Sequence, residues 1–166
     1  MFAYLLSLMS GFLVKSVDHL EDDLKHKSKV KYLLAIAYGI VIGVLISRAP
    51  FSTLFLAALL AQVFTEKVDC RSHVVGFFVA IMSLIAFGLP SLDLTIFSFF
   101  FLLAMIDEVE WMGKLGFIGD YRPFLKLGGL VLLYFGQWYY FAGIILFDIG
   151  YLLATELYKD EIHLRF

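Results

Sequence analysis

Few of the residues are charged and only one is a cysteine, and each shortage excludes a class of protein. A single cysteine, Cys70, cannot form a disulfide within the chain or supply a cysteine-based metal site. Charged residues make up 17% of the sequence, against about 25% in a typical soluble domain. The formal net charge is only −2. Bulk charge therefore gives no reason to expect a nucleic-acid partner.

Common catalytic motifs are missing as well. The sequence contains no GxSxG, no HExxH and no P-loop. It also lacks the motif of the CDP-alcohol phosphotransferases. Ser72 and His73 are adjacent and are not part of a strained nucleophile turn, so a Ser-His-Asp hydrolase is not indicated.

Apolar residues, in contrast, are abundant. They account for 61% of the 166 residues, with 18 phenylalanines and 9 tyrosines, and the mean hydropathy is +0.89. A chain of this size cannot bury that much apolar surface in one soluble core. We therefore predict an all-α, polytopic integral membrane helix bundle, with residues 1–166 forming a single transmembrane domain and no soluble domain.

Separate apolar runs predict the number of spans. The five expected full spans are Phe2–Val17, Tyr32–Ser47, Phe51–Phe64, His73–Leu89 and Leu92–Ile106. Residues 111–123 hold three glycines and a proline and are expected to form a loop. The next stretch, Phe124–Leu157, would be about 50 Å long as one helix, well beyond a hydrocarbon core of about 30 Å. A break or re-entrant bend near Gly136 would divide it into one or two further segments.

Two local signals bear on helix packing and helix ends. Gly39 and Gly43 form a GxxxG pair, which permits close helix contact and offers a face for a homodimer. Asp93 follows Pro90-Ser91 and is expected to start the next helix as a capping residue.

Lysine and arginine are distributed unevenly between the two predicted membrane faces. If the N-terminus is outside, the cytoplasmic connections carry nearly all of them and the opposite face carries only Arg48. The predicted location is therefore the cell membrane, multi-pass, with the N-terminus outside. The cytoplasmic cations are Lys15, Lys25, Lys27, Lys29, Lys31, Lys67, Arg71, Lys114, Arg122 and Lys126.

Acidic residues converge on the same predicted face. Ser16–Lys31 is densely charged, and Asp18 and Asp22 share a helix face if the segment stays helical. Asp69, Asp107 and Glu108 end later inward-running spans. Within Ser16–Lys31, Glu21 and Asp23 are interpreted as part of a solvated, self-neutralised connection with Lys25 and Lys27.

One further acid lies inside an apolar run. Asp148 sits in ILFDIGYLLA, at a depth where an acid is costly unless it is neutral, paired or bound to metal. It is a functional candidate for that reason.

Several carboxylates at one interface need a positive partner, and hard cations such as magnesium prefer oxygen ligands. We predict a divalent-cation site, magnesium favoured, held by Asp18, Asp22, Asp69, Asp107 and Glu108. The predicted catalytic acids are Asp18, Asp22, Asp107 and Asp148. Arg71 and Arg122 are the expected contacts to a substrate phosphate, because arginine pairs with phosphate oxygens in a bidentate manner.

The spacing Asp18-x-x-x-Asp22-Asp23 resembles the aspartate-rich motifs of UbiA-type membrane prenyltransferases, over about six residues. The resemblance implies acids that hold magnesium against an isoprenoid diphosphate. The asparagine that usually opens that family's first motif is absent, because Val17 precedes Asp18, and the chain is far shorter than those enzymes.

Three functions follow from these patterns. The first is a magnesium-dependent transferase or phosphatase acting on a lipid (polyprenyl) phosphate or diphosphate, with membrane lipid as partner. The second is a small cation or proton transporter or channel that uses intramembrane Asp148. The third is a non-catalytic membrane interaction protein.

Overall fold

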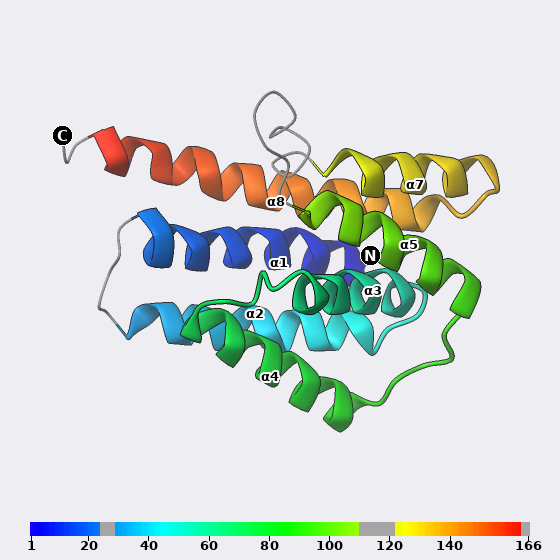
Figure 1. Ribbon diagram of the computed structural model, residues 1–166, viewed down its shortest axis with the longest axis horizontal. Helices are drawn as coiled ribbons and strands as arrows, with labels where there is room; N and C mark the ends of the chain where they lie inside the picture. The colour runs from blue at the N-terminus through cyan, green and yellow to red at the C-terminus, as the bar shows by residue number, and fades with distance from the viewer. Residues whose placement is uncertain (24–28, 110–121, 164–166) are drawn as a thin grey trace.

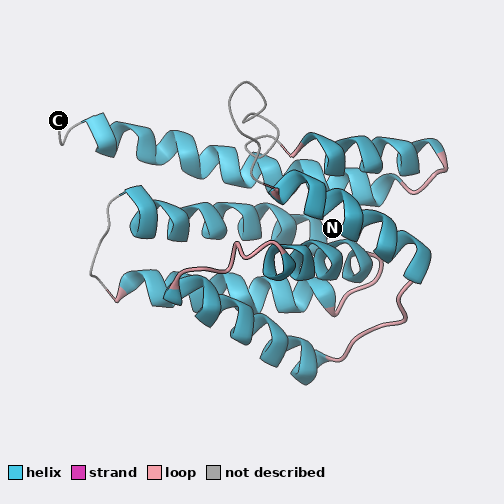
Figure 2. Ribbon diagram, in the orientation of Figure 1, coloured by secondary structure: helices cyan, strands magenta, loops and turns pink. Residues whose placement is uncertain are grey.

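A computed structural model describes residues 1–23, 29–109 and 122–163. Within these ranges the chain is almost entirely helical and contains no strand, and the helices lie side by side in one bundle (Figures 1 and 2). The all-α part of the prediction is therefore confirmed for the described residues. The loop predicted at residues 111–123 lies almost wholly outside them.

The boundaries of the first five α-helices match the five predicted spans to within about two residues, whereas the last described helix, α8, extends six residues beyond the predicted end at Leu157. The first helix, α1, continues into a short π-helix, η1, which carries the acids that follow Asp18. The elements are α1 (Phe2–Asp18), η1 (His19–Asp23), α2 (Val30–Ile46), α3 (Phe51–Phe64), α4 (Arg71–Phe87), α5 (Leu94–Glu108), α7 (Pro123–Tyr134) and α8 (Trp138–His163).

The long C-terminal apolar stretch breaks where glycine permits it. Gly136 has φ +80°, a left-handed conformation that side chains with a Cβ adopt at a cost. The amide of Gln137 then bonds to the carbonyl of Leu132 at 2.9 Å, which closes the C-terminus of α7 and lets α8 turn back. Asp93 also behaves as predicted, because its carboxylate accepts bonds from the amides of Thr95 and Ile96 at the start of α5.

Glycines set the closest helix contacts. A Cβ at Gly11 or Gly150 would lie 1.9 Å from a backbone carbonyl oxygen of the other helix, so α1 and α8 meet backbone to backbone. Gly39 and Gly43 bring α2 equally close to α4, where a Cβ would fall within 2.6 Å of backbone oxygens. The GxxxG pair thus makes a close contact inside one chain. The face expected to form a homodimer is covered by α4, so a second copy would have to bind elsewhere.

Neighbouring helices form an incomplete ring. α4 packs on α2, α2 on α1, α1 on α8, α8 on α7, α7 on α5, and α5 on α3. α3 also touches α2, to which it is joined by a short turn, and α8. Among the described helices, α3 and α4 form no contact of comparable extent, and Figure 1 shows α4 diverging from the rest of the bundle.

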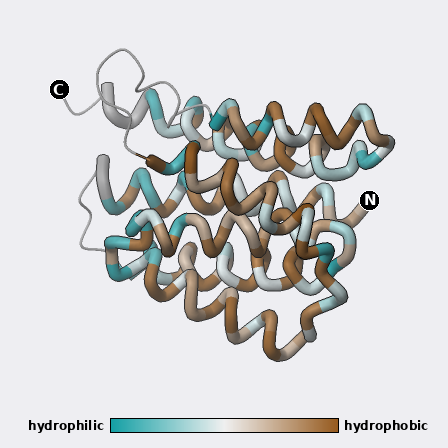
Figure 3. Tube along the Cα trace, turned by 45° about the vertical axis from the view of Figure 1, so that its right-hand side comes forward, coloured by the Kyte–Doolittle hydropathy of each residue, from teal (hydrophilic) through white to brown (hydrophobic). Residues whose placement is uncertain are grey.

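Membrane-spanning length is reached by one described helix. Trp138–Lys159 of α8 is long and apolar enough to cross a membrane. Four other apolar helices are shorter, between 10 and 17 residues. In the view of Figure 3, apolar residues run along most of the length of the helices, and hydrophilic residues gather toward the helix ends and connections.

Candidate functional site

A cavity of about 360 Å³ lies inside the bundle, at the end where α1, α3 and α5 finish and α4 and α7 begin. Lys67 and Asp69 line it and are themselves exposed, so the cavity reaches the surface in the α3–α4 loop. Its polar and charged lining residues are Asp18, Tyr38, Gln62, Lys67, Asp69, His73, Glu108, Arg122 and Asp148. Its apolar walls include Val14, Ile42, Leu54, Phe55, Leu59, Phe77, Leu125, Ile144 and Phe147.

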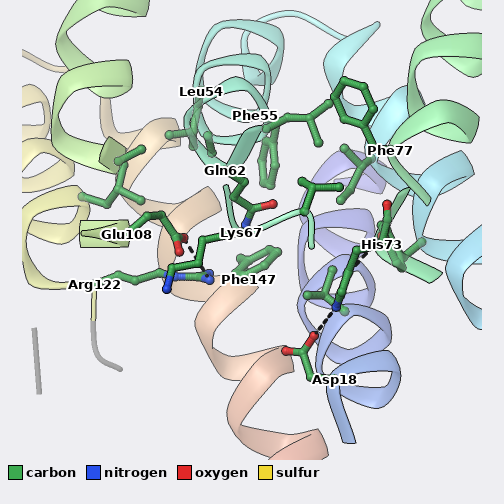
Figure 4. A pocket seen from close by; sticks show the side chains of 18 of the residues that line it. Asp18, Leu54, Phe55, Gln62, Lys67, His73, Phe77, Glu108, Arg122 and Phe147 are labelled. Carbon is green, nitrogen blue, oxygen red and sulfur yellow. Dashed lines mark hydrogen bonds and ion pairs between the residues drawn. The ribbon is translucent and has the colours of Figure 1, made fainter. Parts of the chain in front are cut away.

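Polar and apolar residues are segregated within the cavity. In Figure 4, Leu54, Phe55 and Phe77 lie to one side, while Glu108 and Arg122 lie toward the other with Lys67. This separation follows largely from the sequence, because most charged residues of the lining lie at the helix ends that meet here, Asp148 in the middle of α8 excepted. The cavity is therefore amphipathic.

Asp18 is the centre of a three-helix network. At the end of α1, its Oδ1 lies 3.0 Å from Nε2 of His73 on α4. Its Oδ2 accepts a bond of 3.1 Å from the hydroxyl of Tyr151 on α8. On the far side of the imidazole, the hydroxyl of Tyr38 lies 3.3 Å from Nδ1 of His73 and donates to the His73 carbonyl at 3.2 Å. Both ring nitrogens thus face polar groups, which fixes the ring in the cavity wall.

Arg122 and Glu108 form the second charged group. Their closest nitrogen–oxygen distance is 3.2 Å, and the guanidinium also lies over the ring of Phe147 at 5.6 Å. Burial tends to lower the pKa of Arg122, but nearby carboxylates, Glu108 first among them, raise it overall. The guanidinium therefore stays charged. Arg122 has φ 45°, a left-handed backbone that is uncommon for this residue type and that directs the chain into α7.

Asp148 is paired rather than isolated. Its Oδ2 lies 2.5 Å from Nζ of Lys126, which joins the middle of α8 to the first turn of α7. The side chains are 18% and 28% exposed. The pair explains how an acid is accommodated within α8, which among the described helices is the one long and apolar enough to span a membrane. Asp148 nevertheless lines the cavity, in agreement with its status as a candidate.

Asp107 does not belong to the cavity. It is fully buried, and its two oxygens accept bonds from the amides of Phe124 and Leu125, at 3.0 and 2.7 Å. The first amides of a helix have no partners within that helix, so Asp107 serves as a cap for α7 supplied by α5. Asp107, predicted as a catalytic and metal-binding acid, is therefore not among the residues that the structure brings to the cavity, and its contacts are those of a helix cap.

The remaining predicted site residues have different outcomes. Asp18, Asp69, Glu108, Asp148 and Arg122 are brought together around one cavity. Arg71, the other predicted phosphate contact, is exposed at the start of α4 and is not among the residues that line the cavity. Asp22 lies in η1, and its side chain is outside the described part of the structure.

Three of the acids that line the cavity contact a basic residue. Asp18, Glu108 and Asp148 are paired with His73, Arg122 and Lys126. Within the ranges 1–23, 29–109 and 122–163, no group of three or more His, Cys, Asp or Glu residues could hold a metal ion. A metal-binding cluster of protein ligands alone is thus not assembled from the described acids.

Sequence reasoning did not assign four residues of the site. Tyr38 and Tyr151 lie within apolar helices, and no pattern in the sequence distinguishes them from tyrosines that only pack in the core. Lys67 and Lys126 were counted as markers of orientation and not as site residues. His73 was noticeable from its position one turn after Asp69, although the structure pairs it with Asp18 instead.

No protein-family model matches the sequence, and no curated protein or solved structure shows significant similarity to it. The class of protein is therefore defined by the fold and the cavity: an all-α bundle with an amphipathic cavity bordered by ion pairs.

Proposed function

We propose that this protein is a multi-pass membrane protein that binds a lipid phosphate or diphosphate in the amphipathic cavity. The observation that carries the proposal is the cavity itself, in which apolar walls lead to Arg122, Lys67 and His73 at one charged end. An amphiphile changes along its length from an apolar chain to an anionic head, and this change matches the change from apolar to charged residues in the cavity. Soluble phosphates would leave the apolar walls unfilled.

Exposed apolar surface supports the membrane part of the proposal. On α4, Phe78, Met82 and Ile85 are 62%, 64% and 71% exposed and fall on one face. Only 28% of the most apolar window of α8 is buried, whereas the core helix of a soluble protein is mostly buried. A soluble monomer rarely exposes such continuous apolar surface. A 17-residue helix is about 26 Å long, slightly short of the roughly 30 Å core, a mismatch that local thinning accommodates.

The charged end of the cavity fits the head of such a lipid. Arg122 carries a fork of donors suited to two phosphate oxygens, and a phosphate would compete with Glu108 for it. In the proposed orientation, with the N-terminus outside, this end faces the cytoplasm. A magnesium ion remains part of the proposal, because magnesium is commonly held by one or two carboxylates together with substrate phosphates and water. Glu108 and Asp69 are the acids that would hold it.

Transport of a cation or proton is the second candidate, supported by Asp148. A path across the bundle would need polar groups toward the opposite end, which carries Arg48 and Asp93. Neither residue lines the cavity. The cavity therefore favours lipid binding.

Two arginines at the same end of the bundle provide a matched test. Purified protein in detergent is titrated with a polyprenyl phosphate and, separately, with the polyprenol that lacks the phosphate, and thermal unfolding is recorded. At about 100 times Kd, the phosphate should stabilise wild type by about 2.7 kcal/mol, or roughly 5–10 °C. Arg122→Gln should lose most of that shift and Arg71→Gln, outside the cavity, should keep it.

The same titration with and without magnesium tests the divalent ion. A larger shift with magnesium, reduced in Glu108→Gln, would support a shared site. If polyprenol and polyprenyl phosphate stabilise wild type equally, the head is not recognised and the proposal fails. Equal losses in Arg122→Gln and Arg71→Gln would also contradict it, because the effect would then not come from the cavity.

A further inference from the structure

The cavity is too small for the whole of a membrane lipid. If it were round, 360 Å³ would correspond to about 9 Å across, near the lower limit of ligand pockets. A lipid tail that spans one leaflet is about 15 Å long, half of the hydrocarbon core. The cavity therefore has room for a head and the first part of a chain, and the rest of the tail must leave the bundle between two helices.

Three of the interfaces between neighbouring helices are closed by backbone contacts or hydrogen bonds. α1 and α8 meet backbone to backbone at Gly11 and Gly150, and α2 meets α4 in the same way at Gly39. The α5–α7 joint is fixed by the two bonds from α7 amides to Asp107. These contacts leave no room for a hydrocarbon chain to pass.

The joint between α3 and α4 is different. Among the described residues, these two helices form no extensive contact, and the α3–α4 loop lies between them (Figure 1). A second hollow, of about 450 Å³, lies in this joint between Val63 and Val74. It shares Val68, Asp69 and Phe77 with the central cavity, so the same side chains border both spaces.

Apolar and exposed side chains surround the outer hollow. Val63 on α3 is 38% exposed, and Val74 and Phe78 on α4 are 37% and 62% exposed. The two acids among the residues that line the hollow, Glu66 and Asp69, both belong to the connecting loop, and the lining residues on α3 and α4 are apolar. A hydrocarbon chain running from the cavity along the helix walls of this groove would meet Val63, Val74 and Phe78.

Resting on the function proposed above, we propose that the groove between α3 and α4 is the binding site for the lipid's hydrocarbon tail and its entrance from the bilayer. Phe77 and Val68 form the passage between the head cavity and the groove. The ligand is accordingly a long-chain phosphate taken up sideways from the membrane, with its head reaching Arg122.

Closing the groove tests the proposal. The double variant Val63→Cys and Val74→Cys, made in a Cys70→Ser background, is joined across the groove with a bis-maleimide. Binding of a long-chain and of a short-chain polyprenyl phosphate is measured before and after the reaction. We expect the cross-link to weaken long-chain binding at least tenfold and to leave short-chain binding unchanged. Each single-cysteine variant, treated with the same reagent, is the control.

A second variant avoids any dependence on cross-linking. Val74→Trp fills part of the groove outside the head cavity and should weaken long-chain binding while sparing the short-chain ligand. Unchanged long-chain affinity in both the cross-linked protein and Val74→Trp would overturn the tail site but leave the proposed head site intact. If neither phosphate binds wild type, the proposed function itself fails, and the tail site fails with it.

Discussion

The ion pair between Lys126 and Asp148 should contribute measurably to stability, and it decides how Asp148 is interpreted. The nitrogen–oxygen distance is 2.5 Å, and the side chains are 28% and 18% exposed. Breaking a fully buried pair by removing one partner costs about 3–5 kcal/mol, whereas exposed pairs contribute about 0–1 kcal/mol. For this partly buried pair we expect Lys126→Met and Asp148→Asn each to cost about 2 kcal/mol.

The double variant separates pairing from other effects. Removing both charges leaves no uncompensated ion, so Lys126→Met with Asp148→Asn should lie within about 1 kcal/mol of wild type. The coupling energy from the double-mutant cycle would then be about 3 kcal/mol. Thermal unfolding in detergent is the assay, and each single variant should lower Tm by roughly 4–8 °C.

A surface pair supplies the control for this cycle. Lys159 and Glu156 are 3.4 Å apart on α8 but 59% and 74% exposed, and their coupling should be well under 1 kcal/mol. The reasoning is refuted if the Lys126–Asp148 coupling is no larger than that of the control. Should the double variant be stable yet unable to bind the lipid phosphate, Asp148 acts in the site beyond its pairing.

Two further predictions concern packing and pH. Gly150→Ala should prevent the close approach of α1 and α8 and lower the free energy of unfolding by about 1–3 kcal/mol or more, because the added methyl group clashes with a backbone oxygen. In the same unfolding assay, Gly128→Ala should cost less, because its methyl group meets the movable end of the Leu103 side chain. Burial raises the pKa of Glu21, but hydrogen bonds from Lys31 and Ser72 lower it overall. Glu21→Gln should therefore lower the free energy of unfolding by its full amount at pH values above the ordinary pKa of 4.5, and by less as the pH falls through the lowered pKa of Glu21. A difference between wild type and variant that stays constant across that pH range would contradict the contacts of Glu21 with Lys31 and Ser72.

Sequence patterns indicated which acids lie near one another better than they indicated the partners of those acids. Of the acids predicted at the site, four line one cavity, Asp107 does not, and the side chain of Asp22 lies outside the described residues; the four are Asp18, Asp69, Glu108 and Asp148. Helix ends that alternate in direction place every second connection at the same end of a bundle, which accounts for Asp18, Asp69 and Glu108 but not for Asp148 in the middle of α8. The same logic could not distinguish Asp107 from its neighbour Glu108, since adjacent residues on a helix point about 100° apart.

The sequence could not predict which residue each acid contacts. Asp18 meets His73 across 55 positions of chain and Tyr151 across 133. Neither spacing has a period to detect. The predicted magnesium cluster assumed that the acids face one another, whereas Asp18, Glu108 and Asp148 each contact a basic residue from another part of the chain.

By itself, the sequence determined that the chain folds as a series of apolar helices, where they begin and end, and that a break falls at Gly136. These features depend on local propensity, glycine and the length of apolar runs, all of which are written along the chain. Tertiary structure alone decided that the Gly39–Gly43 face would pack against α4 of the same chain, and that the Asp107 carboxylate would cap α7. It also decided that the interface between α3 and α4 would stay open. Those outcomes depend on the distances between segments far apart in sequence, which are fixed only when the helices pack.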